Sequence, residues 1–156
     1  MSKPPEEKAV ELAYRAIARR DKTVAEVRAF LQVREVEPEA VEYALSELAE
    51  AGFLDDERFA QRLTEDKRSL ERWGRERIER ELLRRGVLSG LAAAAAVEGH
   101  GRETELEAAV ALLMDKVAPP DGDRERDKAW RLLVRKGYEP EVAYEAVRVH
   151  ERREAA

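Results

Sequence analysis

The sequence predicts an all-α protein, and three observations support this prediction. Residues that favour helices dominate the 156 positions: 25 are Ala, whereas only two Ile and three Thr occur. No stretch shows the alternation of apolar and polar residues between turns that is typical of strands. Pro and Gly residues stand between amphipathic segments, where helices begin and end. We therefore expect helices joined by short turns.

The first three helices can be placed from their end signals. The first is predicted over residues 6–20, where apolar residues recur at helical spacing. Thr23 and Glu26 form a capping box that begins the second helix. Pro38 begins the third, because Pro is tolerated in a first turn, and Gly52 ends it. These helices make one three-helix unit.

The same organisation recurs with a period of 51 residues. The Glu-Pro-Glu motif at residues 37–39 appears again two periods later, at residues 139–141. Apolar positions align in the same register, as do Leu31, Leu82 and Leu133. Gly86 and Gly137 precede the third helix of their units, where a left-handed residue is favoured, while the first unit has Glu35 there. The chain thus reads as a repeat protein.

Three repeats account for the length, and we expect them at residues 1–53, 54–101 and 102–156. In the second repeat, Asp55 or Asp56 is expected to cap the first helix. The second helix follows Trp73-Gly74, and an Ala-rich run forms the third. Tandem units of this kind contact mainly their neighbours, so we expect an elongated array.

The helices of the third repeat are expected over residues 105–117, 124–136 and 140–152. The turn Pro119-Pro120-Asp121-Gly122 separates the first two of them.

Composition excludes several classes of function. The chain lacks Cys, which rules out disulfides and thiol chemistry and favours a reducing compartment, so we expect a cytoplasmic protein. Its start lacks the features of a signal peptide, and no apolar stretch is long enough to span a membrane. His100 and His150 have no motif partners, and no Gly-rich phosphate loop occurs. We expect no enzyme, and no catalytic, metal or cofactor site.

Net charge is −5, but basic residues are concentrated locally. The first repeat is acidic. On the second helix of the second repeat, one side holds Arg at i, i+3 and i+7, opposite Ile78 and Leu82, and the third repeat has basic residues at the same three positions. The two basic stripes consist of Arg77, Arg80 and Arg84, and of Lys128, Arg131 and Arg135. The first repeat has Glu26, Ala29 and Val33 instead.

The basic stripes can be a solvated surface or a binding surface. Like charges one turn apart destabilise a helix by a few tenths of a kcal/mol, so stability alone does not explain their repetition. A polyanion or an acidic protein would relieve this repulsion, and the planar fork of Arg suits phosphate and carboxylate. Trp73 and Trp130 lie nearby; packing in the core or between repeats is favoured for both, with base stacking an alternative for Trp130.

Several segments together resemble the RecX family of bacterial recombination regulators. They are Gly52-Phe53-Leu54-Asp55-Asp56-Glu57-Arg58-Phe59-Ala60, Trp73-Gly74, Ile78-Glu79-Arg80-Glu81-Leu82-Leu83-Arg84-Arg85-Gly86-Val87 and Lys128-Ala129-Trp130-Arg131-Leu132-Leu133-Val134-Arg135-Lys136-Gly137-Tyr138. The resemblance covers nearly the whole chain. Bulkier apolar residues would be more usual in the family than the Ala run at residues 92–96.

The resemblance implies a non-enzymatic array of three-helix repeats that binds the RecA recombinase filament on DNA. We expect the array to be a monomer. It further implies modulation, typically inhibition, of strand exchange, ATPase and coprotease activity, and hence regulation of DNA repair and the SOS response. We expect the two basic stripes to face DNA phosphates or acidic filament surfaces, with weak binding to free DNA. The alternatives are a stand-alone helical DNA-binding regulator and a protein scaffold that never touches DNA.

Overall fold

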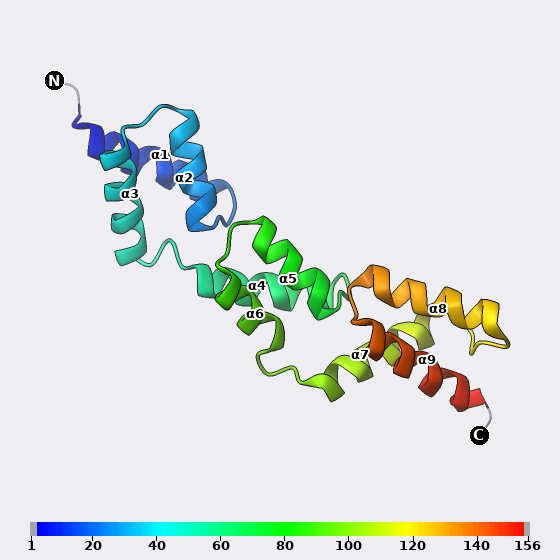
Figure 1. Ribbon diagram of the computed structural model, residues 1–156. Helices are drawn as coiled ribbons and strands as arrows, with labels where there is room; N and C mark the ends of the chain where they lie inside the picture. The colour runs from blue at the N-terminus through cyan, green and yellow to red at the C-terminus, as the bar shows by residue number, and fades with distance from the viewer. Residues whose placement is uncertain (1–2, 155–156) are drawn as a thin grey trace. The chain divides into compact units, whose positions relative to one another are not determined.

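The computed structural model describes residues 3–154, and this part of the chain contains nine helices and no strand (Figure 1). The helices are α1 (Pro5–Arg19), α2 (Val24–Val33), α3 (Pro38–Glu50), α4 (Asp56–Ser69), α5 (Arg75–Arg84), α6 (Ser89–Val97), α7 (Arg102–Lys116), α8 (Asp123–Lys136) and α9 (Pro140–Glu154). The predicted all-α class of helical repeats is confirmed. The bounds of α7 differ most from the prediction, because the helix begins three residues earlier, directly after Gly101.

Local signals in the sequence explain most helix ends. The capping box is present, with the Thr23 hydroxyl accepting from the Glu26 N–H and the Glu26 carboxylate accepting from the Thr23 N–H. Asp55 caps α4, since its carboxylate accepts from the N–H of Arg58 at 3.1 Å. Gly137 ends α8 in the left-handed conformation, with φ of 102°.

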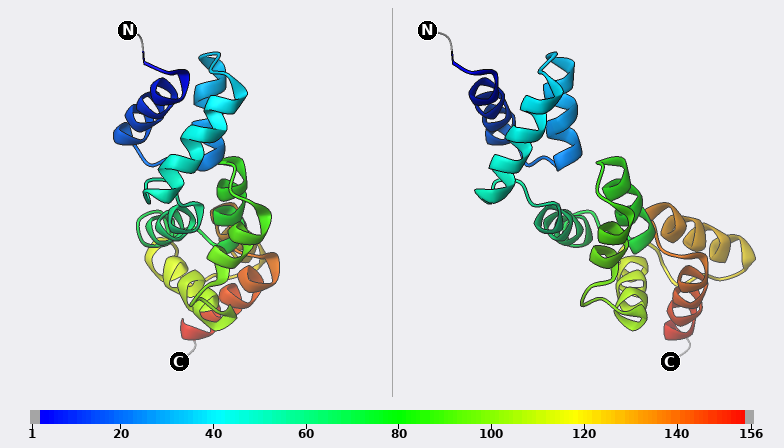
Figure 2. Two further views of the ribbon diagram at one scale, coloured as in Figure 1. Left: turned by 90° about the vertical axis from the view of Figure 1, so that its left-hand side faces the viewer. Right: turned by 60° about the vertical axis from the view of Figure 1, so that its left-hand side comes forward.

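The chain divides into two compact units whose boundary falls inside α4, α5 and α6. Unit 1 comprises residues 1–62 and 82–92, and unit 2 comprises residues 63–81 and 93–156. In unit 1, α1, α2 and α3 lie side by side (Figure 1 and Figure 2). Their shared core is rich in Ala and Leu and includes Ala9, Ala13, Val27, Leu31, Ala44 and Leu48.

Unit 2 has its own core, formed chiefly by α7, α8 and α9. Leu112, Leu113 and Leu133 are completely buried there, and Tyr138 is almost so. The Tyr138 hydroxyl donates to the carbonyl oxygen of Arg72 at 3.3 Å, and burial raises the pKa of Tyr138 to about 12. None of the helices in residues 3–154 is long and apolar enough to cross a membrane.

Candidate functional site

The two basic stripes lie on α5 and α8. The α5 stripe is Arg77, Arg80 and Arg84, and the α8 stripe is Lys128, Arg131 and Arg135. All of these side chains are exposed except Arg77, which is half-buried. Ile78 and Leu82, which were predicted to be buried on α5, are fully buried. Most of each stripe therefore lies at the protein surface.

Within unit 2, the C-terminal end of α8 meets the N-terminal end of α5. The N–H of Gly74 donates to the carbonyl oxygen of Lys136 at 2.8 Å, and the N–H of Glu76 donates to that of Gly137 at 3.0 Å. These bonds satisfy backbone groups that helix ends leave unpaired. They also set the negative end of one helix dipole against the positive end of the other. The last residue of the α8 stripe, Arg135, therefore lies next to the first residue of the α5 stripe, Arg77.

Two glycines allow this close approach. A Cβ atom added to Gly137 would overlap the Cβ of Arg77, and its φ of 102° also disfavours any other residue. A Cβ atom added to Gly74 would overlap the backbone of Gly137. Gly137, which the repeat register predicts, is thus required both for the end of α8 and for the contact between α8 and α5.

Arg77 is part of this junction. Its guanidinium carbon lies 4.2 Å from the centroid of the Trp73 ring, and its Nη1 donates to the carbonyl oxygen of Arg135 at 3.2 Å. The Nζ of Lys67 lies 4.6 Å from the same Trp73 centroid. Trp73 is half-buried, and its ring lies against these two cations. Arg77 joins the two basic stripes, and the exposed cations extend on either side of it.

A buried carboxylate also supports the start of α5. Glu105, on α7, is only 1% exposed; its Oε2 accepts from the N–H of Arg75 at 2.7 Å. Its Oε1 lies 2.9 Å from Nε2 of His100. A carboxylate at a helix N-terminus is favoured by the free N–H groups and by the helix dipole. Glu105 thereby fixes the end of α5 that carries Arg77.

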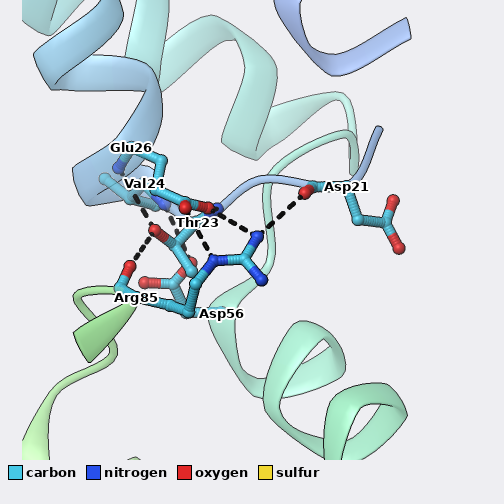
Figure 3. A network of polar contacts seen from close by, with 6 residues as sticks. All are labelled: Asp21, Thr23, Val24, Glu26, Asp56 and Arg85. Carbon is cyan, nitrogen blue, oxygen red and sulfur yellow. Dashed lines mark hydrogen bonds and ion pairs between the residues drawn. The ribbon is translucent and has the colours of Figure 1, made fainter. Parts of the chain in front are cut away.

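Unit 1 contains a related junction between the end of α5 and the start of α2 (Figure 3). The Thr23 hydroxyl donates to the carbonyl oxygen of Arg85 at 2.6 Å. The carboxylate of Asp56 accepts from the N–H of Val24 at 2.9 Å. The Arg85 guanidinium binds both carboxylate oxygens of Glu26, at 2.7 and 3.0 Å. The ion pair between Arg85 and Glu26 therefore joins the two helices in unit 1. In unit 2, the hydrogen bond from Arg77 to the carbonyl oxygen of Arg135 has this role.

The two carboxylates of the unit 1 junction have opposite pKa shifts. Burial alone would raise the pKa of Glu26, but hydrogen bonds from Arg85 and from the Thr23 backbone hold that pKa below its ordinary value. Burial raises the pKa of Asp56, despite the hydrogen bond from Val24, and nearby Asp55 and Glu26 add to the shift. Glu26 is therefore stabilised as a carboxylate, whereas Asp56 is ionised at a cost.

Sequence reasoning missed both carboxylates that cap a distant helix. The sequence predicts that Asp55 or Asp56 caps its own helix; Asp55 has that role, and Asp56 binds the start of α2 instead. It predicts Glu105 as the first residue of a helix, without a partner on α5. Both residues share a feature of the sequence, because each is acidic and lies in the first turn of a repeat's first helix. The sequence does not indicate which distant N–H each carboxylate binds.

Nine helices in residues 3–154, joined end to side by backbone hydrogen bonds and carboxylate caps and with exposed cations on α5 and α8, define a helical-repeat protein. The family model "RecX, second three-helix domain" matches residues 55–95. The chain is 32% identical to regulatory protein RecX of Amycolatopsis mediterranei (strain U-32), over 93% of this chain and 86% of the relative. It is also 32% identical to regulatory protein RecX of Stenotrophomonas maltophilia (strain K279a), over 94% and 89%. The chain belongs to the RecX family.

Solved structures show the same fold. The crystal structure of RecX from Lactobacillus salivarius matches 94% of this chain and 97% of its own, with a TM-score of 0.83 and 15% identity. A second structure, of regulatory protein RecX, has a TM-score of 0.76 and 19% identity. The fold and the family resemblance predicted from the sequence are confirmed. The names of the relatives give this chain a regulatory role.

Proposed function

We propose that this protein binds the nucleoprotein filament of a RecA-type recombinase and inhibits its ATPase, recombination and coprotease activities, thereby regulating DNA repair in the cytoplasm. The α8–α5 junction carries this proposal, because it joins two basic stripes that the sequence repeats at the same positions. A filament on DNA offers a long row of phosphates to such a surface.

The charges support contact with phosphates more than readout of bases. Arg80, Lys128 and Arg135 are exposed. Arg131 is also exposed, and it pairs with Asp127 on its own helix at 2.9 Å. An exposed ion pair of this kind contributes little free energy, so a phosphate can replace the Asp127 carboxylate at small cost. Such contacts bind strongly at low salt and carry no sequence preference.

The test replaces Arg80 and Arg131 together by Glu. We expect the variant to lose its inhibition of recombinase-driven ATP hydrolysis on single-stranded DNA, while circular dichroism stays helical. Two fewer phosphate contacts should also lower the slope of log affinity against log salt by about 2. The matched control replaces exposed Arg15 and Arg19 by Glu, which changes the net charge equally on α1. Full inhibition by the Arg80/Arg131 variant would overturn the proposal.

A mobility-shift assay with random duplex, single strand and assembled filament separates the alternatives. Preference for the filament supports the proposal. Tight, sequence-selective binding to duplex without recombinase would identify a stand-alone DNA-binding regulator instead. Binding to recombinase with no salt-dependent affinity for DNA would identify a protein scaffold.

A further inference from the structure

A groove lies on the surface of unit 2 beside the α8 stripe. Its volume is about 710 Å³, and its lining includes Trp130, Pro140, Tyr144, Arg148 and Arg152. A second hollow of about 360 Å³ shares Trp130, Tyr144 and Arg148 with it. The second hollow is also lined by Asp127, which pairs with Arg131 at 2.9 Å, so the groove borders the proposed phosphate-binding surface.

Both aromatic rings in the groove are held in place. The Nε1–H of Trp130 donates to the carbonyl oxygen of Pro140 at 3.1 Å, and the ring packs partly against the core of unit 2. Tyr144 is 59% exposed, yet its hydroxyl accepts from Nη1 of Arg148 at 2.9 Å. The guanidinium carbon of Arg148 lies 5.6 Å from the centroid of the Tyr144 ring. Apolar surface that is contiguous and rimmed by polar residues is typical of a binding site.

The charges around the groove favour an anion at one end. Arg148 and Arg152 lie one turn apart on α9. Glu145 is paired with Arg102 at 2.8 Å, so these two charges largely cancel. Glu141 also lines the groove, near Pro140. Anionic groups are therefore favoured at the Arg148 and Arg152 end and disfavoured at the Glu141 end.

We propose that this groove binds a segment of single-stranded nucleic acid. A base stacks on the exposed ring of Tyr144, with Trp130 as the second apolar wall, and the adjoining phosphates meet Arg148 and Arg152. Aromatic faces flanked by Arg are the features that bind single strands without sequence preference. A duplex keeps its base faces stacked, so the site selects an open strand. This proposal deepens the proposed function by adding base contacts to the phosphate contacts of the stripes.

The test uses Trp130 fluorescence in a Trp73→Phe background, where Trp130 is the only Trp. A thymidine oligonucleotide and an abasic oligonucleotide of equal length carry the same phosphates. We expect the thymidine oligonucleotide to quench the fluorescence and to bind about 10-fold more tightly than the abasic one. Tyr144→Ala should remove most of this difference, and Glu141→Gln should tighten binding about 2-fold through lost repulsion. Tyr43→Ala, an exposed aromatic of unit 1, is the control and should change nothing.

Equal affinity for the two oligonucleotides, with no effect of Tyr144→Ala, would overturn the groove proposal. Loss of recombinase binding without DNA in the Tyr144→Ala variant, with thymidine binding retained, would overturn it in favour of a protein segment. Either result leaves the Arg80/Arg131 experiment unaffected, because that experiment reads inhibition of the filament. Conversely, a failed filament test with base-dependent binding intact would reject the proposed function and retain the groove.

Discussion

The buried carboxylate of Glu105 binds the N–H of Arg75, and a helix end is thereby fixed by a residue 30 positions away in the sequence. The matching bond in unit 1 runs from the N–H of Val24 to Asp56, 32 positions away. In both junctions the acidic side chain comes from the first helix of the next repeat along the chain: Asp56 from α4 and Glu105 from α7.

Replacing Glu105 by Ala should destabilise unit 2 by about 3–5 kcal/mol, because the N–H of Arg75 and the ring of His100 would lose a buried partner. Glu105→Gln keeps an acceptor and should cost less. Exposed Glu107 on the same helix provides the control, and Glu107→Ala should stay within about 0.5 kcal/mol. Urea unfolding followed by circular dichroism measures these differences. Equal effects of Glu105→Ala and Glu107→Ala would contradict the capping role.

Gly137→Ala tests the close approach of α8 and α5. The substitution combines strain at a φ of 102° with overlap of the new Cβ and Arg77. Gly52→Ala is the matched control, since Gly52 has a φ of 81° and no atom lies near its added Cβ. Gly52→Ala should cost about 1–2 kcal/mol from backbone strain alone. A larger loss in melting temperature for Gly137→Ala would measure the overlap, and identical losses would show that the helices do not meet closely.

Acid should weaken the unit 1 junction through Glu26. The pKa of Glu26 is lower in the folded protein than its ordinary value, so its ion pair with Arg85 adds stability above the unfolded-state pKa, which is about 4.3. This stability is lost as the pH falls through the folded-state pKa. Thermal unfolding between pH 7 and pH 3 should show a steeper loss for the wild type than for Glu26→Gln. Parallel curves would mean that Arg85 does not stabilise the Glu26 carboxylate.

Asp56 has the opposite pH dependence. Its pKa is raised in the folded protein, so its contribution to stability is present below the unfolded-state pKa and lost as the pH rises through the folded-state pKa. Asp56→Asn keeps an oxygen acceptor for Val24 and removes the cost of a buried charge, and we expect equal or greater stability at pH 7. Asp56→Ala should lose about 1 kcal/mol, as expected for a lost cap. Greater loss for Asn than for Ala would contradict this assignment.

The local signals were sufficient to predict the helices. The Thr23 capping box, Pro38 and Gly137 each act on neighbouring backbone atoms, so their effect can be read from adjacent residues. The period of 51 residues also located both basic stripes. The division at residues 53/54 and 101/102 stays a prediction, as does the role of the stripes.

Contacts over long sequence separations were not predictable. Arg77 was expected on an open face, but it is half-buried because the end of α8 lies against it. Trp130 packs partly against the core, as the sequence predicted, but the groove that it also lines could not be predicted. Such outcomes depend on which helix ends meet, and helical periodicity carries no information about that.

In each repeat, the residue shortly before the third helix has a positive φ: Glu35, Gly86 and Gly137. Gly86 and Gly137 permit another helix to begin directly against them, and an added Cβ at either site would overlap Ala25 or Arg77. Glu35 occupies the corresponding place in the first unit, with φ of 58° and a side chain of its own. A helix that approached this place as closely as α2 approaches Gly86, or α5 approaches Gly137, would therefore overlap the Cβ of Glu35.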